Sequence, residues 1–188
     1  ASSGLLNPEV GGPSVFPLQP DGVMSLGQMK RSWTPSKGED RYRRGMYTYF
    51  WRATPNPSLM VFDAPDSFST CTRRPRSNTP LQALTLLNDQ GYYELAHALA
   101  ERVMSEGPAG DVAKIDYAFK LCTSRPPDVM EQSRLAELLK SEQAAFTQAP
   151  EEAKELVGAK EKLDNVQLAA WMTVSRVLLN LDETITRE

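Results

Sequence analysis

Over residues 79–105 the chain reads TPLQALTLLNDQGYYELAHALAERVMS. Thr79 is a good N-cap residue, and proline, here Pro80, is favoured at the first position of a helix. The stretch predicts a helix from about residue 80 to residue 105, weakened near Asp89-Gln90-Gly91 because an interior glycine destabilises a helix. The apolar residues that recur at helical spacing and should face a core are Leu84, Leu87, Leu95, Ala98, Leu99 and Val103.

Four further helices are expected on the C-terminal side of this stretch. The second of the five helices should stop before Pro126-Pro127, and the third opens with a capping-box pattern formed by Asp128 and Glu131. The expected helix starts are Asp111, Asp128, a position near Pro150, and Asp164 or Asn165. Their expected inward residues are Ile115, Ala118, Phe119, Cys122, Leu135, Leu138, Leu139, Phe146, Ala169, Ala170, Val174, Val177, Leu178 and Leu181.

Residues 1–78 have a different composition. Ten of the fourteen prolines and seven of the eleven glycines lie before residue 81, and proline both lacks an amide donor and restricts the residue before it. Only Met46–Trp51 has strand character. Because the region contains many aromatic residues, we expect ordered loops that wrap onto the helices rather than disorder. The predicted fold class is mainly α: a bundle of about five helices over 79–188, preceded by a Pro/Gly-rich loop region with at most a short strand or hairpin.

Composition and charge narrow the function classes. The chain has 188 residues, 40% of them hydrophobic and 24% charged, which is typical of a globular protein. No apolar run approaches about 18 residues, so no membrane span is expected. Residues 1–78 carry ten Lys/Arg against six Asp/Glu, and residues 79–188 carry eleven against eighteen. This basic excess is small and interleaved with carboxylates, so no nucleic-acid partner is expected.

Cysteine and histidine usage argues against several kinds of site. Cys71 and Cys122 form no C-x-x-C pair, which excludes a zinc ribbon, a thioredoxin-type site and c-type haem attachment in this segment. Two buried thiols are favoured, with one long-range disulfide as the alternative. The single histidine, His97, lies between Glu94 and Glu101 on a predicted helix and is interpreted as a surface or boundary residue. We therefore expect no metal site, and neither a P-loop nor a Gly-x-Ser-x-Gly motif occurs.

The densest polar motif, residues 37–52, combines arginines with aromatic residues, and a second basic patch lies at residues 73–76. Arginine offers a planar fork of donors suited to sulfate, phosphate or carboxylate, and it stacks on aromatic rings. The motif could therefore bind an anionic ligand such as a sulfated polysaccharide. The alternative is that the arginines pair with nearby carboxylates and hold the loops together. The candidate binding residues are Arg41, Arg43, Arg44, Arg73, Arg74, Tyr47, Tyr49 and Trp51.

Asp63 and Asp66 supply two carboxylates within four residues. Such a pair could perform acid–base chemistry in a hydrolase. Aspartates beside a proline are also common in turns, where they accept bonds from backbone amides. No catalytic residue is assigned, and both aspartates remain candidate ligand-binding residues.

Several short motifs follow one another along the chain and together resemble a known family. They are GGPSV at 11–15, GEDRYRRGMYT at 38–48, FDAPD at 62–66, RSNTPLQALTLLND at 76–89, AW at 170–171 and RVLLNLDE at 176–183. The set resembles the "PSD-one" domain, a domain of unknown function abundant in planctomycetes and related bacteria. The resemblance covers nearly the whole chain, which looks like the C-terminal portion of that domain.

The resemblance implies a setting rather than a reaction. In this family the domain forms the C-terminal part of large exported proteins, many of which carry an upstream cytochrome c module. The resemblance therefore implies a periplasmic or cell-envelope location, with upstream domains of the same polypeptide as partners. It also implies that any haem c is bound by an upstream domain, so no cofactor is expected in this segment. The leading hypothesis is a non-catalytic structural or interaction domain. The alternatives are a binder of anionic polysaccharide and a hydrolase or redox-enzyme component that uses Asp63 and Asp66.

Overall fold

The computed structural model describes residues 1–27, 31–73, 75, 77–158 and 164–186. Within these residues the chain forms eight α-helices and three short 3₁₀ helices, and no strand. The prediction of a mainly α fold is confirmed. The chain divides into two compact units, one of Ala1–Gly4 with Tyr93–Glu188 and the other of Leu5–Tyr92. We call them the helical unit and the loop unit.

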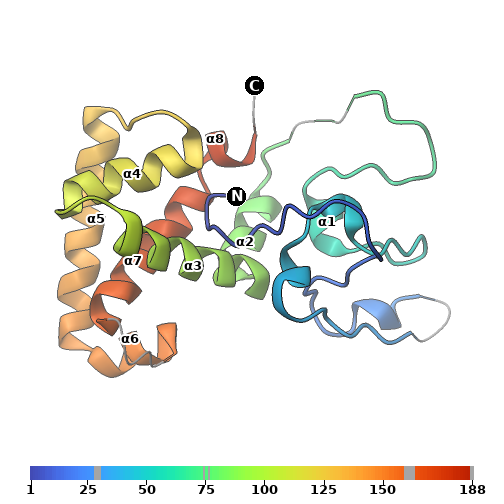
Figure 1. The fold of residues 1–188 in the computed structure, drawn as a ribbon, viewed down its shortest axis with the longest axis horizontal. Helices are drawn as coiled ribbons and strands as arrows, with labels where there is room; N and C mark the ends of the chain where they lie inside the picture. The colour runs from blue at the N-terminus through green and yellow to red at the C-terminus, as the bar shows by residue number, and fades with distance from the viewer. Residues whose placement is uncertain (28–30, 74, 76, 159–163, 187–188) are drawn as a thin grey trace. The chain divides into compact units, whose positions relative to one another are not determined.

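The helical unit contains most of the α-helical structure (Figure 1). Within it α5 and α6 both pack against α7, and α4 contacts both α5 and α7. The helices are α3 (Gln90–Glu106, which begins in the loop unit), α4 (Asp111–Thr123), α5 (Val129–Gln148), α6 (Pro150–Val157), α7 (Asn165–Leu179) and α8 (Asp182–Ile185). The expected starts at Asp111, Asp128, Pro150 and Asp164 agree with these bounds to within one residue.

The long first helix of the prediction is broken in two. α2 (Pro80–Asn88) ends where Asp89 adopts an extended backbone, and α3 starts at Gln90. The Asp89 carboxylate then accepts a bond from the Gly91 amide at 2.8 Å, which satisfies a donor at the new helix start. The local weakness expected at Asp89-Gln90-Gly91 is therefore a full interruption.

Reciprocal caps define two of the helix starts. Thr79 and Gln82 exchange side-chain and backbone bonds at the start of α2. Asp128 and Glu131 do the same at the start of α5, with both distances at 2.7 Å. Each cap satisfies two amides that a helix start leaves unpaired, which is why these boundaries could be predicted from sequence.

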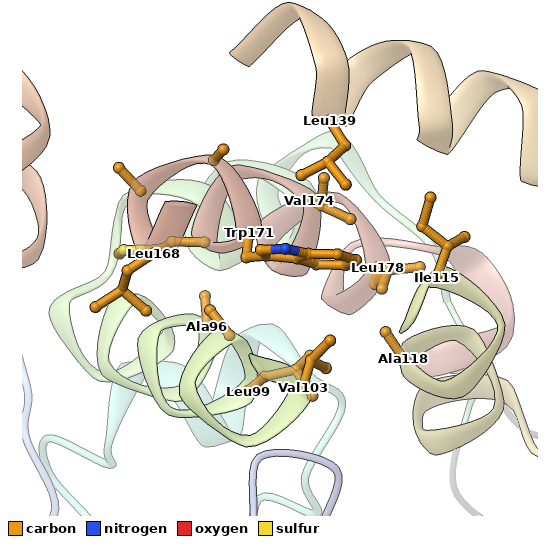
Figure 2. Close-up of a cluster of buried hydrophobic side chains, with 14 of the residues drawn as sticks. Ala96, Leu99, Val103, Ile115, Ala118, Leu139, Leu168, Trp171, Val174 and Leu178 are labelled. Carbon is orange, nitrogen blue, oxygen red and sulfur yellow. The ribbon is translucent and has the colours of Figure 1, made fainter. Parts of the chain in front are cut away.

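Trp171 occupies the centre of the helical core. Its side chain is 1% exposed, and Figure 2 shows it between α3 residues on one side and Leu139 of α5 on the other. Ile115 and Ala118 of α4 close one end of the cluster. The wholly buried residues contributed by α3 are Ala96, Leu99, Ala100 and Val103. One large aromatic residue thus contacts side chains from several helices, and its packing ties them together.

Most of the predicted inward residues are buried, with two corrections. Leu84 is 56% exposed and Val177 is 38% exposed, so both predictions were wrong. On α2 the buried leucine is Leu86 instead. This helix carries leucines around most of its circumference, so spacing alone could not select the buried face. Val177 lies one residue before the buried Leu178, at the edge of the buried face of α7.

The first four residues belong to the helical unit. The Arg102 guanidinium donates to the carbonyls of Ala1 and Ser2 at 3.3 and 2.9 Å, and it also pairs with Glu106 at 2.9 Å. The Ser2 hydroxyl donates to the Leu121 carbonyl at 2.9 Å. Sequence periodicity gives no sign of these contacts, because they join residues about a hundred positions apart.

The loop unit is built from extended segments, 3₁₀ turns and two helices. Its elements are η1 (Val23–Ser25), η2 (Gly38–Tyr42), η3 (Gly45–Tyr47), α1 (Pro57–Val61) and α2. Isolated parallel bridges join Asn7 to Arg43 and Val15 to Thr48. The strand character of Met46–Trp51 therefore produces a single bridged position, while its first two residues lie in a 3₁₀ turn. The predicted boundary at residue 79 marks a change of composition. Along the sequence, the loop unit ends at Tyr92 and the helical unit resumes at Tyr93.

Both cysteines are free thiols. Cys122 is buried as expected, and burial raises its thiol pKa to about 11. Cys71 is exposed, so the expectation that both thiols are buried was wrong for this residue. Among the helices in the described ranges, none has both the length and the apolar character needed to cross a bilayer.

Candidate functional site

Four aromatic side chains of the loop unit form a continuous group, which we call the aromatic stack. Phe16 stacks on Tyr49 with ring centroids 5.0 Å apart, and Tyr49 stacks on Trp51 at 6.1 Å. Trp33 meets Phe16 edge-on at 5.1 Å. All four rings are partly buried. The group therefore combines a fixed apolar body with surface that remains open to solvent.

Backbone pairing brings these rings together. The Val15 amide donates to the Tyr47 carbonyl, and the Tyr49 amide donates to the Val15 carbonyl, each at 2.8 Å. This pairing places Phe16 beside Tyr49. The Trp33 indole N–H donates to the Pro17 carbonyl at 2.8 Å, which fixes the third ring. The stack thus depends on contacts between segments that are distant in sequence.

An arginine covers one end of the aromatic stack. The Arg31 guanidinium carbon lies 4.3 Å from the centroid of the Trp51 ring. Arg31 is exposed, so its donors remain available to solvent while the ring orients the planar group. This arrangement can bind an anion such as a sulfate or carboxylate with a fork of N–H groups.

Arg43 and Tyr47 instead hold the glycine-rich loop in place. The Arg43 guanidinium lies 4.1 Å from the Tyr47 ring centroid and donates to the carbonyls of Glu9 and Gly11. The Gly11 amide donates to the Tyr47 hydroxyl at 3.0 Å. Gly11 has a φ of 88°, which only glycine adopts readily. These two candidates therefore make structural contacts within the loop unit.

The other candidate arginines occupy different surroundings. Arg41 is partly buried, and its guanidinium carbon is 5.7 Å from the Tyr42 ring centroid. Arg44 and Arg73 are exposed. Arg74 lies outside the described residues.

Asp63 and Asp66 are both engaged in local hydrogen bonds. Asp63, at a φ of 57°, accepts bonds from the Ser77 amide and hydroxyl at 3.2 and 2.6 Å. The buried Gln82 amide in turn donates to the Ser77 hydroxyl and to the Val61 carbonyl, each at 2.9 Å. Asp66 accepts from the Phe68 amide at 3.0 Å. The network joins the end of α1 to the start of α2, which is a structural use of Asp63.

One tyrosine of the loop unit, Tyr92, has a raised pKa. Tyr92 packs against Phe62 with ring centroids 5.6 Å apart, and burial, with Asp89 nearby, raises its pKa to about 12. Its phenol is therefore neutral near neutral pH. In the described part of the chain, no three His, Cys, Asp or Glu side chains gather as a metal site. In the helical unit, the His97 ring lies 3.2 Å from the Val157 carbonyl at the end of α6.

The structure brings together some of the predicted site residues and adds others. Tyr49 and Trp51 share the aromatic stack, whereas Tyr47 pairs with Arg43. Sequence reasoning missed Arg31 as a site residue and did not connect Phe16 and Trp33 with Tyr49. A regular sequence period would have been the usual signal for such grouping, but irregular loops have none.

The family model for PSD1, a protein of unknown function (DUF1553), matches residues 1–139. The chain belongs to the PSD1 family. The PSD1 match covers the loop unit, α3 and α4, and it ends within α5. The two motifs at residues 170–171 and 176–183, which also resemble this family, lie outside the matched range. No curated protein and no solved structure matches this PSD1 chain.

Proposed function

We propose that this PSD1 chain is a non-catalytic interaction domain that binds an anionic, sulfated polysaccharide through the aromatic stack and Arg31. The observation that carries the proposal is the Arg31 guanidinium held 4.3 Å from the Trp51 ring centroid while remaining exposed. A stacked guanidinium has lost part of its rotational freedom, so it can bind a sulfate at a lower entropic cost. Tyr49 and Phe16 extend the apolar surface on which sugar rings can lie.

The charge distribution supports an anionic ligand. Residues 1–78 hold ten Lys/Arg against six Asp/Glu, so the region around the stack is basic. The rest of the chain is acidic and should repel a long polyanion that extends beyond the loop unit. A sulfated oligosaccharide of limited length fits this distribution better than nucleic acid.

A hydrolase or redox-enzyme role that uses Asp63 and Asp66 is the weaker alternative. Both carboxylates accept bonds from neighbouring backbone amides, and Asp63 also holds Ser77. These contacts account for the two aspartates without a substrate. Replacing both by alanine in the full protein and retaining its activity would eliminate the alternative.

The proposal is tested by calorimetric titration of the whole chain with sulfated and neutral oligosaccharides of equal length. We expect heat from the sulfated ligands only, and a weaker affinity as salt is raised because salt screens exposed charges. Arg31→Gln should weaken binding about tenfold, since a charge-assisted hydrogen bond contributes roughly 1.5 kcal/mol. Trp51→Ala should weaken it by a comparable factor.

Arg134→Gln is the matched control, because Arg134 is an exposed arginine of α5 in the helical unit. It should bind like the unmodified chain. Equal binding by Arg31→Gln and Arg134→Gln, or no heat from any sulfated ligand, would contradict the proposal. A short DNA duplex included as a second polyanion should give no binding.

The cellular setting forms part of the same proposal. The PSD1 resemblance supports an exported, cytochrome c-linked planctomycete-type protein in the periplasm or cell envelope, with haem c in an upstream domain. This domain would then contact polysaccharide and the upstream domains of its own polypeptide. Fractionation of source cells followed by haem staining of the full-length protein tests the setting, and a haem-free cytoplasmic protein would refute it.

A further inference from the structure

The Trp51 end of the aromatic stack carries two sources of hydrogen-bond donors. The Arg31 guanidinium carbon lies over the Trp51 ring, 4.3 Å from its centroid, and Arg31 is exposed. Trp51 is partly buried and has an N–H at the edge of its ring. Guanidinium and indole nitrogens donate hydrogen bonds and accept none. This end of the stack therefore suits a ligand group that only accepts.

Neither donor source is used by a neighbouring group. Within the described residues no carboxylate forms an ion pair with Arg31, so its charge is not neutralised locally. The Trp51 indole N–H has no acceptor among the same residues, whereas the Trp33 indole N–H donates to the Pro17 carbonyl at 2.8 Å. Trp33 thus uses its N–H to hold a loop, while Trp51 has its own available for a ligand.

The two donor sources do not share a plane. The indole N–H lies in the plane of the Trp51 ring, whereas the Arg31 guanidinium carbon lies over the face of that ring. A carboxylate has two oxygens in one plane, and an arginine fork binds both of them in that plane. A sulfate ester has three terminal oxygens arranged as a pyramid, so one remains outside the plane of the fork. Sulfate can accept from Arg31 and Trp51 together, and a carboxylate held by the fork fits the second donor less well.

The carboxylate of Asp21 lies in a different part of the surroundings of Arg31. Asp21 and Arg31 both line a hollow formed with the turn at residues 19–25. Trp51 is not among the residues described along that hollow. An anion bound at the edge of the Trp51 ring is therefore outside the hollow that Asp21 lines.

We infer that Trp51 is a specificity-determining residue, whose indole N–H acts with the Arg31 fork to select a sulfate ester over the carboxylate of a uronic acid. The inference rests on the proposed function, because it concerns the same surface, and it names the anionic group that the polysaccharide must carry. The Trp51 ring orients Arg31 for either anion, and its N–H makes the distinction between them.

Calorimetric titration of the whole chain with two oligosaccharides of equal length and charge, one sulfated and one built from uronic acids, tests the inference. The sulfated ligand should bind about tenfold more tightly, the factor expected for one hydrogen bond to a charged group. Trp51→Phe keeps a ring beneath Arg31 but removes the N–H. It should weaken binding of the sulfated ligand about tenfold and leave uronate binding nearly unchanged, so that the two affinities become similar.

Trp33→Phe is the matched control, because it removes an indole N–H that is already bonded within the protein. The preference for the sulfated ligand should persist in this variant. Equal affinity of the unmodified chain for the two ligands, or a preference that survives Trp51→Phe, would overturn the inference and leave polysaccharide binding in place. If neither ligand bound, the proposed function would fail and the inference with it.

Indole N–H signals in a ¹H–¹⁵N NMR titration provide a second measurement that needs no altered binding residue. The chain has three tryptophans, Trp33, Trp51 and Trp171, and the phenylalanine variants assign the first two signals. The sulfated ligand should shift the Trp51 signal most, and the uronate ligand should shift it much less. Trp171, which is buried in the helical core, should not respond to either. A Trp51 signal that stays unmoved at saturation with the sulfated ligand would show that its N–H does not bind sulfate, and would refute the assigned role.

Discussion

At the scale of single residues, Trp171 shows how one side chain can organise several helices. Its indole lies between the α3 side chains and Leu139, and it is 1% exposed. Neither helical periodicity nor capping singles this residue out, because it is one of many apolar positions on α7. Its importance follows from tertiary packing, which the pattern of a single helix does not encode.

We expect Trp171→Ala to lower the free energy of unfolding of the helical unit by about 3–5 kcal/mol, the usual cost of removing a buried aromatic side chain. Urea unfolding followed by far-UV circular dichroism measures this change. Val177→Ala on the same helix is the control, since Val177 is 38% exposed and its loss should change stability by less than about 0.5 kcal/mol. Equal effects of the two substitutions would contradict the assigned core.

The two thiols should differ in reactivity. Cys71 is exposed, whereas Cys122 is buried and its thiol pKa is raised to about 11. Because the thiolate is the reacting species, an aromatic disulfide reagent should modify Cys71 rapidly and Cys122 only after denaturation. Cys71→Ser should abolish the fast phase and Cys122→Ser should leave it intact. Two fast thiols in the folded chain would show that Cys122 is accessible.

At the scale of elements, an arginine joins three helices. Arg125, just after α4, donates to both Glu131 oxygens of α5 at 2.7 and 2.8 Å and pairs with Glu183 of α8. Its guanidinium carbon also lies 4.9 Å from the Phe119 ring centroid. These hydrogen bonds from Arg125, with one from the Asp128 amide, lower the pKa of Glu131 to about 2.

The group formed by Arg125, Glu131 and Glu183, which we call the arginine clamp, predicts a pH dependence of stability. The Glu131 pKa is about 2 in the folded chain against 4.5 without these partners, so ionised Glu131 stabilises the fold above pH 4.5. That contribution should decline as the pH falls from 4.5 towards 2. Because both partners are partly exposed, the effect should be modest.

Urea midpoints measured across this pH range test the clamp. Glu131→Gln should lower the midpoint above pH 4.5 and reduce the loss of stability on acidification. Glu137→Gln, at an exposed position of the same helix, should retain the full pH response. Identical pH profiles for the unmodified chain and Glu131→Gln would contradict the role of the clamp.

The helices were predictable where a local chemical signal marks their ends. Thr79 and Asp128 carry capping boxes, and both starts agree with the sequence. The buried face of α2 was not predictable, because Leu84 and Leu86 both lie in a leucine-rich helix and only packing selects between them. The aromatic stack was not predictable either, since it depends on the non-local pairing of Val15 with Thr48.

At the scale of the whole molecule, the composition boundary and the structural boundary differ. Residues 79–92 read as the start of a helical bundle, yet they pack with the loop unit. α1 and α2 contact each other, and the Gln82 side chain links the end of one to the start of the other. The change of composition marks the position after which proline and glycine become less frequent, whereas the compact units are defined by which residues pack together.

Residues 93–188 should therefore fold without the loop unit, because they contain the whole Trp171 cluster. Trp171 is the only tryptophan of this fragment, so its near-UV circular dichroism reports on the core. We expect a cooperative thermal transition in the fragment and a tryptophan signal that disappears with it. A fragment without a tertiary signal would show that the helical core needs the remainder of the chain.

The contacts of Ala1–Gly4 have a consequence for synthesis on the ribosome. These residues emerge before Arg102 and Leu121, the partners that hold them, have been translated. Residues 5–92 are meanwhile complete and free to collapse on their own. Ala1–Gly4 must therefore wait through about a hundred rounds of peptide-bond formation before their partners exist, so their docking cannot be the first event of folding.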